Sequence, residues 1–155
     1  MLVSDVMTRG VFSCTPSHTL KRAAELMAAR NCGWVPVVDE EGRVIGVVTD
    51  RDICMAALRR EERLGRLSVM DAMSEPVVGC SVGDTLDHIV QLMRQNHVRR
   101  MPVLHANGQL EGLISLTDIA LCLAENGQDG SLVDPWEVAS LLADLSRPHF
   151  PKTEN

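Results

Sequence analysis

Two short stretches of the chain place a hydroxyl side chain three residues before a carboxylate, each at the end of an apolar run. Thr49 precedes Asp52, and Ser115 precedes Asp118. A carboxylate only accepts hydrogen bonds, so it suits the two hydroxyls of a ribose, while Thr or Ser can donate to a ribose or phosphate oxygen. At a helix N-terminus, free backbone N–H groups also favour an anion. The alternative is that both aspartates are plain helix-start acids, favoured by the helix dipole.

Other chemistry finds less support in the residue types. Gly46 and Gly112 precede the two pairs, and we expect the missing side chains to let a planar base approach each strand. The five cysteines are odd in number and widely spaced, which favours reduced thiols over disulfides or zinc. No histidine has an evident Ser, Cys or Asp companion in the sequence, so we expect neither an enzyme nor a metal site.

The pairs recur because the chain repeats itself at a constant offset of 66 residues. Pro36 returns as Pro102, and Asp52 returns as Asp118. The sequence therefore predicts two copies of one unit. The predicted ranges are 3–57 for the first copy, 58–68 for a linker, 69–123 for the second copy and 124–155 for a C-terminal tail.

Each copy predicts the same order of elements. A short extended piece comes first, at 11–14 and 77–80, and an amphipathic helix follows with apolar residues at i, i+3, i+4 and i+7. Ser17 or Thr19 can cap that helix in the first copy, and Asp84 or Thr85 in the second. A hairpin of two apolar runs around a glycine-containing turn comes next, and a last helix closes the unit.

The resulting fold class is α/β in composition, an α+β arrangement of two β-α-β-β-α units. Each small sheet leaves an apolar face uncovered, so we expect the two copies to pack sheet against sheet as a pseudo-two-fold pair. In the tail, Asp134 as N-cap and Pro135 in the first turn predict a further helix near 135–146. We expect a loop at 125–130 before it, and Pro148 and Pro151 to end it.

Composition and charge exclude several classes of protein. Hydrophobic residues make up 45% and charged residues 23% of the 155 residues, an ordinary globular balance with few aromatics, so the core must be aliphatic. No apolar run approaches the ~18 residues of a membrane span, and the start shows no secretion signal. The net charge of −6 disfavours nucleic acid as a partner. We expect a cytoplasmic protein.

Further shared motifs point to a family. Asp5-Val6-Met7-Thr8 matches Asp71-Ala72-Met73-Ser74, each copy has a proline-centred strand, and each ends in Gly, two apolar residues, Thr or Ser, two residues and Asp. With these motifs the chain resembles a tandem pair of CBS domains, known as a Bateman module, over about residues 3–123. The resemblance implies a regulatory module that binds adenosine nucleotides or S-adenosylmethionine in clefts between the repeats.

The resemblance also implies which residues touch the ligand. They are Thr15, Val35, Pro36, Thr49, Arg51, Asp52, Ser81, Arg100, Met101, Pro102, Ser115 and Asp118. The two hydroxyl–carboxylate pairs would hold ribose and phosphate, and the proline strands would frame the adenine. Arg100, and also Arg51, would reach phosphate, the alternative being solvated surface charges. Trp34 stands where the second copy has Arg100, so we expect two unequal clefts.

The functional expectation is a nucleotide sensor that needs no cofactor and takes AMP, ADP or ATP as its ligand. Two alternatives remain open, a structural or interaction module with empty clefts and a binder of S-adenosylmethionine. We expect a homodimer formed through the apolar helix stripes, with the tail helix as a clasp, and we leave room for an unidentified protein partner.

Overall fold

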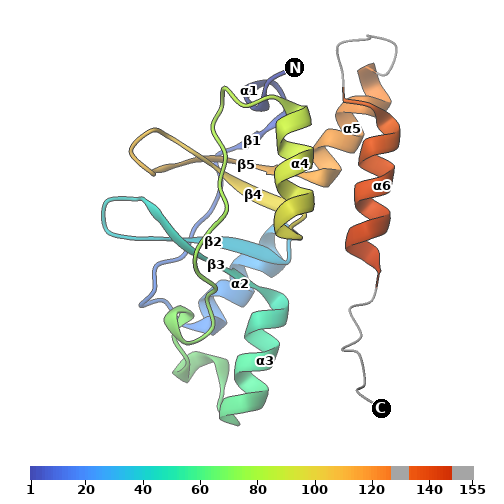
Figure 1. Ribbon diagram of the computed structural model, residues 1–155. Coiled ribbons are helices and arrows are strands. Elements are labelled where there is room, and N and C mark those ends of the chain that lie inside the picture. Colours follow the sequence, from blue (N-terminus) through green and yellow to red (C-terminus); the bar gives the residue numbers. More distant parts are fainter. Residues whose placement is uncertain (127–132, 148–155) are drawn as a thin grey trace.

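Each repeat supplies one β-hairpin and two flanking helices in the computed structural model of the chain, which describes residues 1–126 and 133–147. The first repeat forms α2 (Leu20–Arg30), β2 (Trp34–Val38), β3 (Val44–Thr49) and α3 (Asp50–Arg60). The second forms α4 (Leu86–Asn96), β4 (Arg100–Leu104), β5 (Leu110–Ser115) and α5 (Leu116–Asn126). Figure 1 shows them as two lobes, one above the other, with the hairpins at the middle. The predicted mixed α and β class is confirmed.

The first helix of each repeat is bounded by the same local signals. The hydroxyls of Thr19 and Thr85 accept the backbone N–H three residues on, at 3.2 and 3.3 Å, so the threonines are the caps in both copies. At the other end, Asn31 and His97 take left-handed conformations with φ of 50° and 52°. This conformation ends a helix by turning the chain away from the helix axis.

The first extended piece of each unit is shorter than predicted. Only Cys14 and Cys80 pair there, as single parallel bridges to Val37 and Val103. Each cysteine exchanges two backbone hydrogen bonds with the strand beside it, for example Cys14 N–H to Pro36 O at 2.9 Å. Because Pro36 and its equivalent have no N–H to donate, the ladder does not extend further at that position. The short extended pieces predicted at 11–14 and 77–80 therefore pair with the neighbouring strand at one residue each.

The N-terminal segment of each repeat packs on the other repeat. Val3 and Met7 lie in the hydrophobic core of the second repeat, together with Ile89, Met101 and Ile119. In the same way, residues 64–74 join the core of the first repeat. These segments include α1 (Val3–Val6), β1 (Thr8–Arg9), η1 (Leu64–Arg66) and η2 (Val69–Asp71). We call the two packed bodies lobe one (residues 14–74) and lobe two (residues 1–9 with residues 80–126 and 133–147).

The exchange also completes a sheet. β1 pairs antiparallel with β5, which itself pairs with β4, so lobe two has a three-stranded sheet ordered β1-β5-β4. Lobe one has the two-stranded sheet β2-β3. The chain after β1 therefore passes from lobe two to lobe one beside the open edge of the larger sheet.

The tips of the two hairpins meet and show the symmetry of the pair. Val44 N–H donates to Gly108 O at 3.0 Å, and Leu110 N–H donates to Gly42 O at 3.2 Å. Val44 and Leu110 are equivalent positions at the offset of 66, as are Gly42 and Gly108. The two bonds are therefore the same contact with the repeats exchanged, as a pseudo-two-fold pair requires.

The predicted tail helix is present as α6 (Pro135–Ser146), with the Asp134 carboxylate accepting Trp136 N–H at 2.9 Å. Its apolar stripe of Val138 and Leu141 is buried in the core of lobe two. Figure 1 shows α6 lying along α4 and α5. The predicted loop residues 127–130 and the prolines at 148 and 151 lie outside the described residues.

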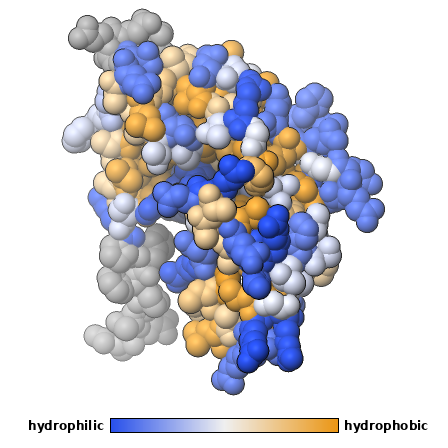
Figure 2. All heavy atoms as spheres, turned by 180° about the vertical axis from the view of Figure 1, so that it is seen from behind, coloured by the Kyte–Doolittle hydropathy of each residue, from blue (hydrophilic) through white to orange (hydrophobic). Residues whose placement is uncertain are grey.

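Among the described residues, no helix has both the length and the apolar character needed to cross a bilayer. Every buried hydrophobic residue of the described chain is aliphatic or sulfur-containing, as the composition predicts. Seen from behind, hydrophilic residues run across the middle of the molecule, where the lobes meet (Figure 2).

Candidate functional site

Both hydroxyl–carboxylate pairs adopt one hydrogen-bonding geometry. Asp118 Oδ2 accepts Ser115 N–H at 2.7 Å and Ser115 Oγ–H at 2.6 Å, and Asp118 N–H donates back to Ser115 Oγ at 3.2 Å. Asp52 and Thr49 repeat this arrangement at 2.9, 2.7 and 3.1 Å. Each pair thus caps the helix that follows it. Because both bonds that each carboxylate accepts end on Oδ2, Oδ1 accepts none from the described residues.

This geometry alone does not define a binding site. Ser68 and Asp71 make the same two bonds to a carboxylate oxygen, at 2.9 and 2.7 Å, where η2 begins. These bonds, with Arg60 nearby, hold the pKa of Asp71 below its usual value, the Ser68 hydroxyl contributing most. What separates Ser115 and Asp118 from this third pair is the cavity that they face.

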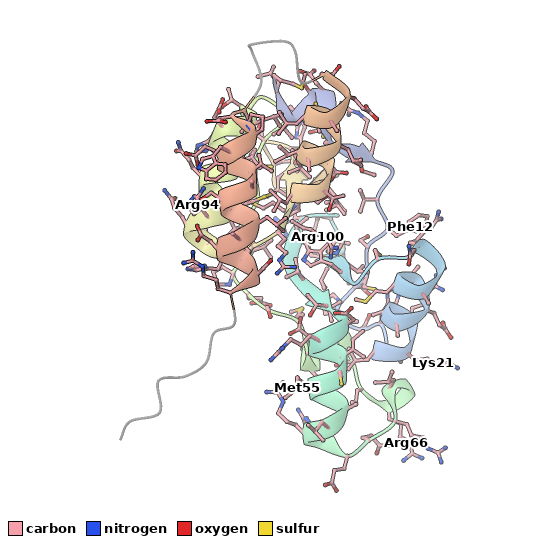
Figure 3. All side chains as sticks on the ribbon, turned by 90° about the vertical axis from the view of Figure 1, so that its right-hand side faces the viewer. Phe12, Lys21, Met55, Arg66, Arg94 and Arg100 are labelled. Atoms are coloured by element: carbon pink, nitrogen blue, oxygen red, sulfur yellow. The ribbon has the colours of Figure 1, made fainter. Side chains whose placement is uncertain are left out.

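Ser115 and Asp118 line a cleft of about 430 Å³ formed by both repeats. One wall consists of Leu113 and Ile114 on β5 together with the Ser115–Asp118 pair. Thr8 and Arg9 extend this wall, because β1 pairs with β5. The other lining residues of the first repeat come from 10–12 and from the end of α2 to Trp34. Figure 3 shows Arg100 near the middle of the molecule and Phe12 toward its right-hand edge, both at the height where the lobes meet. A volume in this range suits a small-molecule ligand.

Of the twelve residues that the resemblance assigned, the cleft brings together Arg100, Ser115 and Asp118. The other nine do not line it. Thr15 and Ser81 lie in turns, where Thr15 N–H donates to His18 Nδ1 and Ser81 N–H donates to Asp84 Oδ2. The proline strands are buried beneath the surface at the following positions: Val35, Pro36, Met101 and Pro102. Thr49, Arg51 and Asp52 lie together at the start of α3, the equivalent position in lobe one.

Several cleft residues were missed by sequence reasoning, notably Arg9, Phe12, Arg30 and Cys32. Arg9 and Phe12 were missed because the segment 8–12 reaches the cleft only by crossing between the lobes. A signal was nevertheless present in the repeat. At the offset of 66, Arg9 and Arg30 correspond to residues without positive charge, so these two positions differ between otherwise similar copies.

The two glycines that recur in the repeats, Gly46 and Gly112, have a different role from the predicted one. A Cβ on Gly112 would lie 2.7 Å from Thr8 O and 3.1 Å from Met7 Sδ, and one on Gly46 would lie 3.1 Å from Met73 Sδ. Each glycine therefore makes room for the crossing segment of the other repeat. The prediction that they admit a planar base was wrong, because protein atoms occupy that space.

The charges of the cleft are predominantly positive. Arg9, Arg30 and Arg100 line it with one carboxylate, Asp118. The guanidinium of Arg30 lies over the ring of Phe12, 3.7 Å from its centroid. Within residues 1–126 and 133–147, no group of three or more His, Cys, Asp and Glu side chains is arranged to hold a metal ion. The arrangement can therefore bind an anion beside a group that offers hydroxyls to Asp118.

Comparison with known proteins identifies the family to which this architecture belongs. The family model for the CBS domain matches twice, over residues 3–59 and 69–125. The CBS domain-containing protein YhcV of Bacillus subtilis is 36% identical over 129 residues, covering 83% of this chain and 90% of YhcV.

Solved structures agree with the family match. The CBS-domain containing protein ATU1752 from Agrobacterium tumefaciens is 31% identical with a TM-score of 0.69, covering 79% of this chain and 98% of that one. The CBS domain pair of protein MJ0100 shares the fold at 22% identity and a TM-score of 0.72, covering 83% and 98%. The two family matches, one on each repeat, show that this chain belongs to the CBS domain family as a CBS-domain pair.

Proposed function

We propose that this CBS pair is a regulatory module that binds an adenosine nucleotide in the cleft of Ser115 and Asp118. The observation that carries the proposal is that this hydroxyl–carboxylate pair opens on a 430 Å³ cleft lined by three arginines. Asp118 Oδ1 would accept ribose hydroxyls while Oδ2 stays bonded to Ser115, and the arginines would face phosphate. No catalytic step is part of the proposal.

Relatives of the same fold support the ligand class. The CBS pair of MJ0100 was crystallised with 5′-methylthioadenosine and S-adenosyl-L-methionine, and CBSX2 was crystallised with AMP. Their sequence identities of 22% and 24% establish the shared fold, so the ligand of this chain rests on its own cleft. Thr49, Asp52 and Arg51 form our proposed second site, equivalent by the repeat.

Thermal unfolding with a panel of adenosine, AMP, ADP, ATP and S-adenosylmethionine tests the proposal. A ligand that binds only the folded state at ~100 times its Kd stabilises the protein by about 2.7 kcal/mol, so the melting temperature rises. The panel is expected to show this shift with at least one phosphorylated adenosine. No shift and no calorimetric heat at millimolar ligand would favour a module whose clefts stay empty.

Asp118→Asn tests the site assignment. The asparagine keeps an oxygen that can accept the Ser115 bonds but removes the charge offered to the ribose, so affinity should fall about tenfold or more. Alanine is a poorer choice, because it also removes both bonds that Ser115 donates to Asp118 Oδ2. Asp71→Asn is the matched control, since it makes the same change in the Ser68–Asp71 pair and should leave binding unchanged.

A further inference from the structure

The Ser115–Asp118 cleft differs in charge from the equivalent position in the other half of the molecule. It is lined by Arg9, Arg30 and Arg100 against one carboxylate, an excess of positive charge in a chain whose net charge is −6. A local positive cavity in an acidic protein concentrates anions there. The charge of this cleft therefore favours an anionic ligand.

The arginines of this cleft are not neutralised by strong ion pairs. Among the described residues, Arg30 and Arg100 have no salt bridge, and Arg9 has only a long one to Glu111 at 3.9 Å. Arg30 is held instead by the ring of Phe12, which lies against the face of the guanidinium at 3.7 Å. An aromatic ring orients the cation without cancelling its charge, and the N–H groups at the guanidinium edge stay available to oxygen atoms.

The repeat provides an internal comparison. At the offset of 66, the positions of Arg9 and Arg30 are occupied by Glu75 and Asn96, and the position of Phe12 is occupied by Val78. Trp34 and Arg100 are equivalent positions under the same offset, and both line this cleft. Arg30 with its aromatic ring Phe12, and the additional cation Arg9, therefore have no counterpart in the other half of the molecule.

We propose, building on the function proposed above, that the Ser115–Asp118 cleft is a site for nucleotides with two or more phosphates and that Arg30, oriented by Phe12, selects the additional phosphate. The ribose lies on the Asp118 wall, while Arg30 at the end of α2 and Arg9 on β1 meet the phosphate chain beyond the first phosphate. The sulfonium of S-adenosylmethionine is disfavoured in this cleft, because three guanidinium groups repel it.

Calorimetry with adenosine, AMP and ADP on the full chain tests this selection. The wild-type protein is expected to bind ADP more tightly than AMP. Arg30→Gln should weaken ADP binding about tenfold or more while leaving adenosine binding unchanged, because a charge-assisted hydrogen bond to phosphate is lost. Phe12→Leu keeps the charge but removes the ring, so it should weaken ADP binding by less.

Lys21→Gln is the matched control, since it removes one positive charge from the other end of the same helix, away from the cleft (Figure 3). It should leave the ratio of the ADP and AMP dissociation constants at the wild-type value. If Arg30→Gln also leaves that ratio unchanged, or if wild type binds AMP as tightly as ADP, the selection by Arg30 is wrong and the nucleotide site stands. If no adenosine compound binds at all, both proposals fail.

Discussion

At the scale of single residues, four of the five cysteines form one buried pair and one exposed pair. Cys14 and Cys80 are buried, and burial raises the pKa of both thiols, that of Cys80 to about 12. Because the thiolate is the reactive form, these two should not react near neutral pH. Cys32 is exposed and lines the cleft, whereas Cys54 is exposed on α3 outside it.

Alkylation of Cys32 should therefore be slowed by a ligand of this cleft. At ten times the Kd of ADP, only about one cleft in eleven is empty, so the alkylation rate at Cys32 should fall about tenfold if the bound ligand covers the thiol. Peptide mass mapping would follow Cys32 and Cys54 in the same sample. Equal slowing at both cysteines would indicate a general change in the protein and would contradict occupancy of this cleft.

At the scale of elements, the crossing segments depend on two glycines that differ in tolerance. A Cβ at Gly112 meets the backbone oxygen of Thr8 at 2.7 Å, whereas at Gly46 the nearest atom is the flexible side chain of Met73 at 3.1 Å. Backbone cannot move aside as a methionine side chain can. The pairing of β1 with β5 thus requires glycine at 112 more strictly than the packing of Met73 requires glycine at 46.

Gly112→Ala should destabilise the protein more than Gly46→Ala. Overpacking of a well-packed site typically costs about 1–3 kcal/mol, and we expect Gly112→Ala within that range and Gly46→Ala below it. Denaturant unfolding of the two variants measures the difference. Equal losses of stability would show that the segment carrying Thr8 moves as easily as the Met73 side chain.

At the scale of the whole molecule, α6 changes which surface is available for assembly. Arg94 on α4 donates to Asp144 at 2.6 Å and to Glu137 at 2.9 Å, so charged contacts as well as apolar ones hold α6 over lobe two. The helices of lobe one have no such cover among the described residues. On α3, Leu58 is 68% and Met55 is 37% exposed, and Figure 3 shows Met55 at the surface of that helix.

We propose that the chain forms a homodimer and that lobe one supplies most of the interface. Light scattering should then report twice the chain mass of 17.0 kDa, and the double variant Met55→Lys with Leu58→Lys should report a monomer. Met70→Lys is the control, because Met70 is similarly exposed at 64% but lies outside α3. A stable interface should bury more than ~1,000 Å². Two charged residues at the centre of such an interface would disrupt it. A monomeric wild type would contradict this assembly.

The sequence by itself determined the features that depend on local order. The helix periodicity, the hairpin turns, the helix α6 and the capping pairs Thr49–Asp52 and Ser115–Asp118 depend on residues within a few positions of one another. The offset of 66 adds the pairing of two like units, because equivalent sequences fold into equivalent structures. Those predictions needed no knowledge of which distant segments meet.

Only the tertiary structure decided which segments meet. The exchange of residues 1–9 and 64–74 between the lobes brings Arg9 and Phe12 into one cleft with Asp118, more than a hundred residues away in the chain. It also assigns Gly112 to backbone packing. The physical reason is that both arrangements, exchanged or not, would bury similar apolar residues in each core. The hydrophobic pattern therefore predicts that a segment is buried, while the packed geometry determines against which lobe.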